Sequence, residues 1–251
     1  MPPESYIGIT GFATPKQIRS FLWDLPRNFD NLLMIAVLAG LPNSPAGRYP
    51  SLKLLPRMFP ESSDKRTLNL VHFQPTEQSK LLDEMSYFQD LIGERCHGFQ
   101  LNTAWPDPRT IETYKIRFGQ KTIVLQINSK AMDEVRRSPT ELTTRLKAYA
   151  DLANYALIDP SAGRGRSFDL DFAAECFSSI RGILPDLGLG VAGGLAPDNL
   201  NRLRPLLANY RFSIDVETGV RRYSNDEFDV SKAVSFAVKA GRLSKQYAQV
   251  D

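Results

Sequence analysis

The chain has 251 residues, of which 24% are charged and 42% hydrophobic, and its formal net charge is +3. This composition is typical of a globular domain and disfavours a disordered chain, a collagen-like repeat or a coiled coil. Lys and Arg together number 31 against 28 Asp and Glu, and no block of five like charges occurs. We therefore expect no nucleic acid and no membrane as partners, and a protein that acts on small molecules, as a monomer or a homodimer.

The cysteines and the hydropathy pattern bear on the compartment. Cys96 and Cys176 have neither the spacing of a metal site nor the density of a disulfide framework. No run of about 18 apolar residues occurs, and the first residues lack the basic and apolar stretches of a signal peptide. These patterns predict a cytoplasmic protein without a metal site.

Short apolar runs alternate with longer amphipathic stretches along the whole chain. Buried strands are expected at Ser5–Gly11, Leu32–Gly40, Thr67–Gln74, Gly98–Thr103, Thr122–Asn128, Tyr155–Pro160, Leu189–Gly194 and Phe212–Glu217. Helices are expected at Pro15–Leu25, Gln78–Ile92, Pro108–Phe118, Ser138–Ala153, Leu170–Leu184, Asn199–Ala208 and Ser231–Leu243. Eight such units without a linker favour an α/β protein, a single closed (β/α)8 barrel over residues 1–251, over an open doubly wound sheet.

One unit is irregular. Residues 41–63, after the second expected strand, contain five prolines, too many for one uninterrupted helix. In a barrel this segment leaves the C-terminal end of a strand, the face that carries active sites. It is therefore either a rim or lid of the site or an insertion without a function.

Glycine turns follow the last two strands. Gly193 and Gly194 end the seventh strand shortly before a helix, and Thr218 and Gly219 follow the eighth. Loops after strands seven and eight form the usual phosphate cradle of such barrels, because their backbone N–H groups can approach an anion. The alternative is that the glycines serve only the steric needs of tight turns.

The sixth strand ends at a carboxyl group. Asp159 closes an apolar run, so in a barrel it is placed to act as a general acid or base at the mouth, unless it only caps a loop. The loop that follows contains Gly163, Arg164, Gly165 and Arg166, and its two arginines could meet an anionic substrate, or one or both could remain solvated.

A histidine near the end of the third strand is the candidate base. His72 lies in an apolar strand near the catalytic face, and an unperturbed imidazole, with a pKa of about 6.5, suits proton transfer. The alternative is a hydrogen-bonded core histidine without a catalytic role.

Several segments resemble a known family in the same order along the chain. The residues that carry the resemblance are Gly8-Ile9-Thr10, Gln100-Leu101, Gly163 and Gly165 with Phe168-Asp169, Ala192–Leu195 with Pro197 and Asn199, and Asp215-Val216 with Gly219-Val220. Together they resemble the phosphoribosylanthranilate isomerases, (β/α)8 barrels that catalyse an Amadori rearrangement of a phosphorylated sugar.

The resemblance implies a set of roles. It implies no metal and no organic cofactor, Asp159 as the general acid, and Arg48 as the residue that holds a substrate carboxylate. The position of the family's basic cysteine is Ile7, which cannot move a proton. Asn102 replaces the family's histidine, and Glu217 replaces a serine beside the expected phosphate site. Glu217 would repel a phosphate unless Arg164, Arg166, Arg221 or Arg222 compensates its charge, or unless it points away.

Three interpretations remain open. The first is a divergent isomerase acting on a phosphorylated sugar or amino-sugar derivative, with Asp159 as acid. The second is a catalytically inactive protein that binds a phosphorylated ligand on the same barrel. The third is a barrel with unrelated chemistry, such as a lyase or an aldolase.

Overall fold

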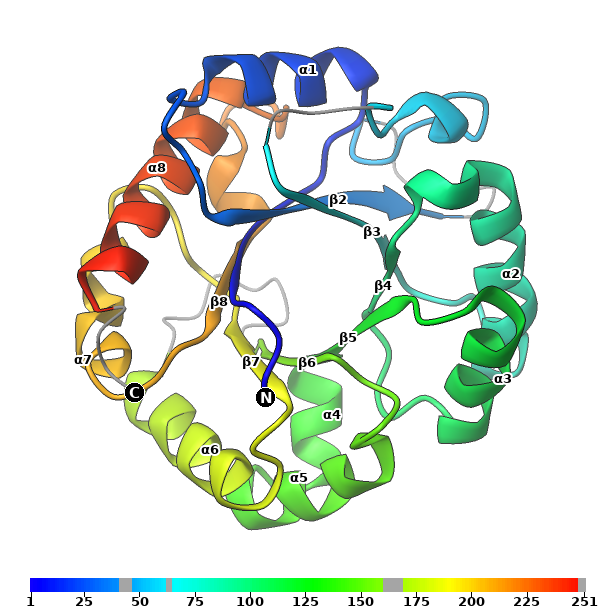
Figure 1. Cartoon of the computed structure of the whole chain (residues 1–251), viewed down its shortest axis with the longest axis vertical. Coiled ribbons are helices and arrows are strands. Elements are labelled where there is room, and N and C mark those ends of the chain that lie inside the picture. The colour runs from blue at the N-terminus through cyan, green and yellow to red at the C-terminus, as the bar shows by residue number, and fades with distance from the viewer. Residues whose placement is uncertain (41–46, 62–64, 160–168, 248–251) are drawn as a thin grey trace.

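The computed structural model describes residues 1–40, 47–61, 65–159 and 169–247. Eight parallel strands pair in chain order, and the eighth also pairs with the first, which closes a barrel (Figure 1). The strands are β1 (Tyr6–Thr10), β2 (Leu32–Ala39), β3 (Thr67–Phe73), β4 (Gly98–Leu101), β5 (Thr122–Ile127), β6 (Tyr155–Ile158), β7 (Gly188–Val191) and β8 (Ser213–Val216). The closed barrel predicted from the alternating pattern is confirmed.

Helices surround this barrel. They are α1 (Pro15–Asp24), α2 (Leu81–Ile92), α3 (Pro108–Phe118), α4 (Ser129–Glu134), α5 (Pro139–Leu146), α6 (Leu170–Ile183), α7 (Arg204–Leu207) and α8 (Val230–Gln246). Their starts follow local chemistry: the Thr14 hydroxyl accepts from the backbone N–H of Gln17, and Ser138 caps α5 in the same way through Glu141.

The expected helix over residues 138–153 differs from the observed one. It ends at Leu146 and continues only as a single 3₁₀ turn, Lys147–Tyr149, and it is preceded by α4, a short helix that the pattern did not predict. Arg136 and Arg137 both have positive φ angles and separate α4 from α5. The expected helix at 199–208 likewise begins as a 3₁₀ turn over Leu200–Leu203, which α7 follows.

Side chains alternate between the inside and the outside of the barrel. The inner layer is apolar near the strand starts, where Tyr6, Met34, Leu70, Val124 and Leu157 pack together. A larger apolar cluster fills the space between the strands and the helices. Because alternate residues face inward, the polar residues at the C-terminal ends of the strands gather at one mouth of the barrel.

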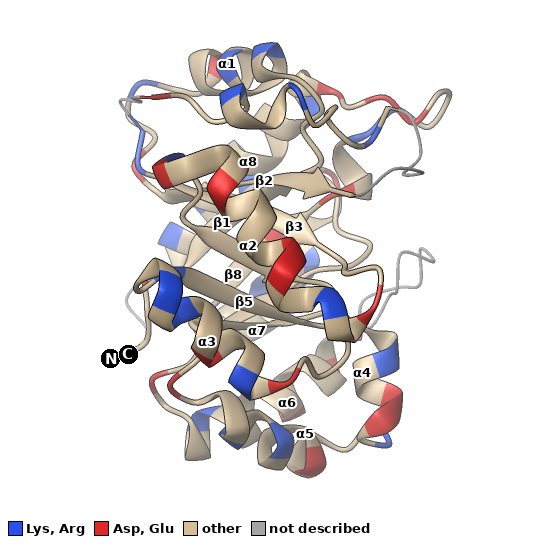
Figure 2. Ribbon diagram, turned by 90° about the vertical axis from the view of Figure 1, so that its right-hand side faces the viewer, with Lys and Arg blue, Asp and Glu red and all other residues tan. Residues whose placement is uncertain are grey.

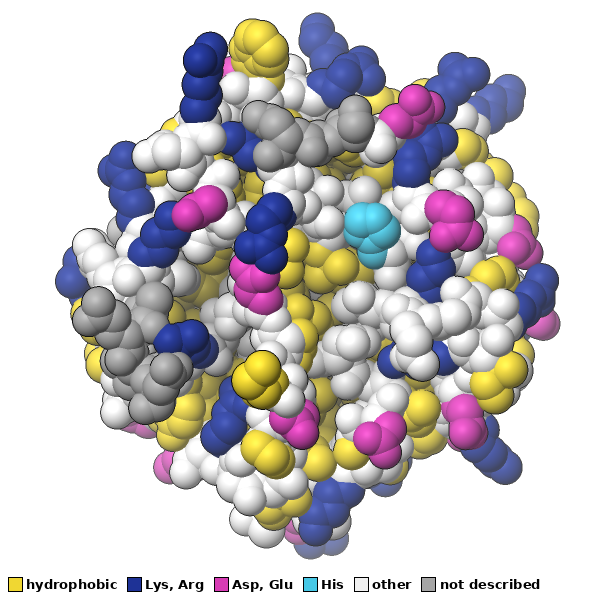
Figure 3. Space-filling model, in the orientation of Figure 1, with side chains coloured by type: hydrophobic (Ala, Val, Ile, Leu, Met, Phe, Trp, Pro, Cys, Tyr) yellow, Lys and Arg dark blue, Asp and Glu magenta, His cyan; other side chains and the backbone are white. Residues whose placement is uncertain are grey.

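Charged side chains surround the end of the barrel at which the strands begin. The N-terminus lies at the end where the strands begin (Figure 2). On that face Lys and Arg side chains lie around the rim with Asp and Glu between them (Figure 3).

Within the described ranges, no helix is long and apolar enough to cross a membrane.

The proline-rich segment is described only over residues 47–61, and its other residues lie outside the described ranges. Over 47–61 its helical structure is one 3₁₀ turn, Leu55–Arg57. This agrees with the absence of a long helix that the prolines predicted.

Candidate functional site

A cleft of about 810 Å³ opens at the C-terminal ends of the strands. It is lined by those sequence-predicted site residues that lie within the described ranges: Arg48, His72, Asp159, Gly193, Gly194, Thr218 and Gly219. The predicted residues Gly163, Arg164 and Gly165 lie outside these ranges. Residues that are far apart in the sequence therefore meet at one mouth of the barrel.

Asp159 follows β6 directly and is 8% exposed. One of its carboxylate oxygens, Oδ2, accepts a hydrogen bond of 2.8 Å from Gln126 Nε2. Gln126 Oε1 in turn accepts from Gln100 Nε2 at 3.2 Å. Two buried amides on β4 and β5 therefore fix the position of the Asp159 carboxyl group.

His72 lies on β3 and is 6% exposed. Its Nδ1 has no hydrogen-bond partner within the described part of the chain, and it lies 3.9 Å from Oε2 of Glu217. Burial lowers the pKa of His72, while Glu217 and Asp159 act in the opposite direction. The imidazole is therefore neutral at neutral pH, and two carboxyl groups are placed to stabilise it once it takes up a proton.

Asp215, on β8, lies deeper in the cleft and is 2% exposed. Thr10 Oγ1 donates a 3.2 Å hydrogen bond to its Oδ1. Burial raises the pKa of Asp215 to about 7; hydrogen bonds from Gln100 and Thr10 oppose this shift, and Glu217 and Asp159 add to it. The site thus holds a carboxyl group that changes charge near neutral pH.

The first strand contributes Thr10 to the cleft. Ile7, the position that the resemblance assigned to a base, is instead buried in the outer apolar cluster between the barrel and the helices. A proton-transfer group at position 7 would therefore not face the cleft, whatever its chemistry.

The two glycine turns lie in backbone contact. A Cβ at Gly219 would come within 1.9 Å of the Leu195 carbonyl oxygen, so only glycine permits this approach. Gly193 and Gly194 both have positive φ angles, which favour glycine. The backbone N–H groups of Gly193, Gly194 and Gly219 donate to no backbone carbonyl of the described residues. All three glycines line this side of the cleft.

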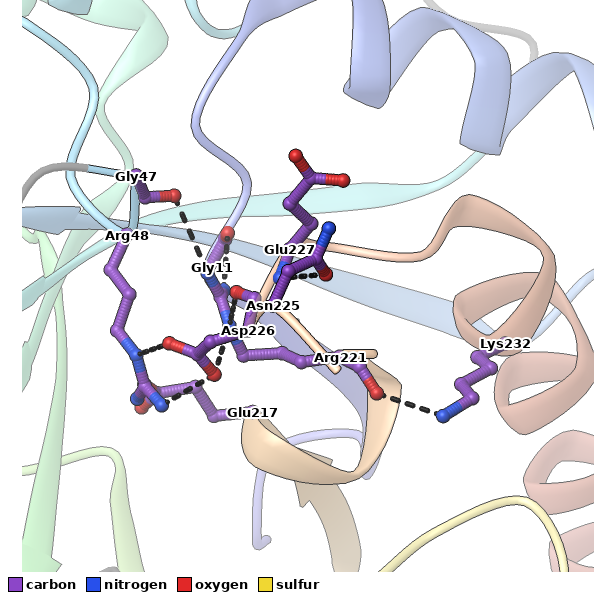
Figure 4. A network of polar contacts seen from close by, with 9 residues as sticks. All are labelled: Gly11, Gly47, Arg48, Glu217, Arg221, Asn225, Asp226, Glu227 and Lys232. Carbon is purple, nitrogen blue, oxygen red and sulfur yellow. Dashed lines mark hydrogen bonds and ion pairs between the residues drawn. The ribbon is translucent and has the colours of Figure 1, made fainter. Parts of the chain in front are cut away.

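Arg48 is held by carboxylates from the β8 side (Figure 4). Its Nε and Nη2 bind the two oxygens of Asp226 at 2.5 and 2.8 Å, and its Nη1 binds Glu217 Oε1 at 3.0 Å. Asp226 also accepts from Arg221 Nε at 3.1 Å. Arg48 therefore compensates the charge of Glu217, a role for which the sequence suggested Arg164, Arg166, Arg221 or Arg222.

Three functional candidates were missed from the sequence: Asp215, Gln100 and Gln126. A signal for them exists. Each is a polar residue inside a buried apolar strand, and Asp215 and Glu217 are two residues apart, so they face the same way. In contrast, Cys96 and Cys176 are both free and buried, and neither lines the cleft. No group of three or more potential metal ligands occurs in the described ranges.

Comparisons with known proteins extend these observations. No family model matches the sequence, and no curated protein does. Among solved structures, the chain is similar to a rubisco-like protein from Burkholderia fungorum, with 12% identity and a TM-score of 0.61. The alignment covers all of this chain but only 62% of that protein.

Two further structures are similar to this chain. A monomeric dihydrodipicolinate synthase variant has 17% identity and a TM-score of 0.55, covering 95% of this chain and 80% of that one. Fructose-bisphosphate aldolase from Campylobacter jejuni has 10% identity and a TM-score of 0.55, covering 98% and 90%. At these identities the likeness concerns the fold alone. By fold, the chain is a (β/α)8 barrel like these proteins.

Proposed function

We propose that this chain is an isomerase that moves protons on a phosphorylated sugar or amino-sugar derivative, as a divergent relative of the phosphoribosylanthranilate isomerases. One observation carries the proposal: Asp159 on the β6 side and His72 on β3 face the same cleft. An aldose–ketose isomerisation needs one group that removes a proton from carbon and one that exchanges a proton with oxygen. His72 and Asp159 are the candidates for these two groups.

His72 is the base in this proposal. Its neutral imidazole accepts the proton from C2 of the sugar, and Glu217, whose Oε2 lies 3.9 Å from Nδ1, stabilises the resulting imidazolium. Asp159, held by Gln126, donates a proton to the C1 oxygen as the enediol forms and takes up the proton of the C2 hydroxyl as the ketone forms. The proton then returns from His72 to C1, so the substrate is isomerised without net gain or loss of protons.

The glycine turns bind the phosphate in this proposal. The N–H groups of Gly193, Gly194 and Gly219 are the donors, and Thr218 lines the cleft beside them. Glu217 stands nearby, but its pairing with Arg48 offsets the repulsion that a lone carboxylate would exert on a phosphate.

The amide groups around the cleft support a substrate rich in hydroxyl groups. Gln100, Asn102, Gln126 and Asn128 all line it, and Asn128 Nδ2 donates to Asn102 Oδ1 at 2.9 Å. Amides both donate and accept, which suits hydroxyl groups that do the same.

The direct test follows freshly generated phosphoribosylanthranilate by its fluorescence. The proposal predicts turnover by the wild type and a loss of about 10²–10⁴-fold in Asp159→Asn and in His72→Asn. Turnover that survives both substitutions would contradict the assigned roles. No turnover by the wild type would remove this substrate from the proposal.

A specific observation favours a second candidate, a binding protein without catalysis. The family's base position, Ile7, faces the outer core, so β1 supplies only the Thr10 hydroxyl to the cleft. A phosphorylated ligand that binds with equal affinity to the wild type and to Asp159→Asn, and is not converted by either protein, would favour this candidate.

A further inference from the structure

Three charged side chains lead in sequence from the β8–α8 loop toward His72. Asp226 accepts from Nε and Nη2 of Arg48 at 2.5 and 2.8 Å, and Nη1 of Arg48 donates to Oε1 of Glu217 at 3.0 Å (Figure 4). The second oxygen of Glu217, Oε2, lies 3.9 Å from Nδ1 of His72. One carboxylate is therefore shared between Arg48 and the candidate base.

The way in which Asp226 binds Arg48 decides how Arg48 can bind Glu217. A guanidinium group has five N–H donors and readily binds both oxygens of one carboxylate. Here Asp226 occupies two of the three nitrogens of Arg48, and a single hydrogen bond reaches Glu217. Without Asp226, Arg48 has the donors to bind both oxygens of Glu217 and to draw Oε2 away from His72.

The backbone of Asp226 provides a second, independent observation. Its φ angle is 55°, a left-handed conformation that is uncommon for residues other than glycine. Its N–H donates to the Arg222 carbonyl at 2.9 Å, and its carbonyl accepts from Arg221 Nε at 2.8 Å. Arg221 Nε also donates to Oδ1 of Asp226 at 3.1 Å. An unfavourable backbone conformation that its surroundings hold in place is typical of functional sites.

His72 depends on nearby carboxylates to take up a proton. Its neighbours in the sheet, Leu38 on β2 and Gln100 on β4, carry no charge. Burial lowers the pKa of His72, and Glu217 and Asp159 oppose this effect. The other charged residues in the described lining of the cleft are Arg48, Lys130, Asp198 and Asp215.

We propose that Asp226 is a positioning residue for His72: by occupying Nε and Nη2 of Arg48, it keeps Oε2 of Glu217 facing the imidazole. The proposal rests on the proposed function for the role of His72 as base. It adds a residue that does not belong to the described lining of the cleft. The charge of Glu217 is then in place when His72 takes up a proton from carbon.

The test is an NMR titration of the imidazole signals in the full chain. The chain has two histidines, so His72→Asn assigns both signals. His97 precedes β4, at the opposite end of that strand from the cleft, and serves as the reference within the molecule. Asp226→Asn removes the charge and keeps the shape of the side chain, and Asn also tolerates a left-handed backbone.

In Asp226→Asn, the titration of His72 should move to lower pH, while that of His97 should not move. Loss of the negative charge and a closer contact between Arg48 and Glu217 act in the same direction. At a fixed pH above the midpoint, the protonated fraction of His72 should fall at least about 2-fold, the size of a weak charge interaction near a protein surface. An unchanged titration of His72, or a His72 that does not titrate in the folded wild type, would overturn the inference.

Two further variants bracket this effect. Glu217→Gln removes the carboxylate next to His72, so the protonated fraction should fall at least about 5-fold. Glu227→Gln removes an exposed carboxylate of the same loop that pairs with Arg222 at 3.8 Å, and it should leave His72 unchanged. Equal effects of Glu227→Gln and Asp226→Asn would mean that any charge of this loop acts on His72, which contradicts positioning by Asp226.

A double variant shows whether Asp226 acts through Arg48. In the Arg48→Met background, Asp226→Asn should move the titration of His72 by less than about half as much as in the wild type. An equal movement in both backgrounds would show that Arg48 does not transmit the effect, and it would overturn the inference.

The titration and the proposed reaction can fail separately. The predicted movement of His72 in a protein that isomerises no sugar phosphate would support positioning by Asp226 and contradict the proposed function. Isomerisation that depends on His72, together with an immobile titration in Asp226→Asn, would overturn the inference alone.

Discussion

Asp215 owes its position to a side chain that is missing on the neighbouring strand. Gly8 pairs with Asp215 in the β1–β8 register, and a Cβ at Gly8 would lie 2.7 Å from Asp215 Oδ1 and 2.8 Å from Met34 Cε. Any larger residue would displace the carboxyl group. The glycine at this position therefore makes room for a buried carboxyl group at the floor of the cleft.

The raised pKa of Asp215 predicts how stability depends on pH. In the unfolded chain an Asp has a pKa of about 3.9, whereas in the fold that of Asp215 is about 7. The folded state therefore holds the extra proton between these values, and stability falls as the pH rises through this window. Above pH 7 the full cost of the buried charge is present.

Asp215→Asn removes this cost while keeping the shape of the side chain. As the pH rises from 5 to 8, the free energy of unfolding of the wild type should fall by on the order of 2 kcal/mol relative to that of the variant. Urea unfolding of both proteins at the two pH values measures this change. A difference between the proteins that is the same at both pH values would show that Asp215 does not titrate in this window.

At the residue scale, the sequence predicted the groups that stand at strand ends. Asp159 and His72 were found because each closes or nearly closes an apolar run, and alternation then places them at the mouth. The partner of Glu217 was not predictable, since Arg48 lies 169 residues away in the chain. Only the closed barrel brings these two residues together.

At the scale of elements, one arginine ties together three loops of the face that carries the cleft. Arg221 donates to the carbonyls of Gly11, in the β1–α1 loop, and of Gly47, in the segment after β2, both at 3.3 Å. It also binds Asp226 within its own loop (Figure 4). Its side chain is 1% exposed, the contact with Gly11 is buried, and those with Gly47 and Asp226 are partly buried.

Replacing this arginine should therefore destabilise the fold. Arg221→Met should cost roughly 2–4 kcal/mol in the free energy of unfolding, because the buried Gly11 carbonyl loses its donor and the contacts with Gly47 and Asp226 are lost as well. The matched control is Arg222→Met next to it, whose side chain is 56% exposed and should change stability by less than about 0.5 kcal/mol. Equal effects in urea unfolding would mean that Arg221 does not tie the loops together.

The elements themselves were predictable where apolar runs and caps agree. Thr14 and Ser138 marked the starts of α1 and α5 correctly. In contrast, α4 has only six residues, and its cap, Asn128, falls at the end of an expected strand. So short a helix has too few turns to show an amphipathic period.

At the scale of the whole molecule, the barrel followed from eight alternating units without a break in composition. Closure between β1 and β8 is a contact between the ends of the chain, and the repeat predicts it because only a closed sheet leaves no edge strand. The reaction could not be predicted from this repeat. The same barrel serves many reactions, and the charges that distinguish this cleft come from strands and loops that meet only in the folded chain.

The most direct test of the central claim measures carbon-bound hydrogen exchange. Ribose 5-phosphate and glucosamine 6-phosphate are incubated with the protein in deuterium oxide, and loss of the C2 proton signal is followed by NMR. With His72 as base, the wild type should exchange this proton at least about 100-fold faster than His72→Asn. Exchange at the same rate in both proteins, or no faster than without protein, would contradict proton transfer by this cleft.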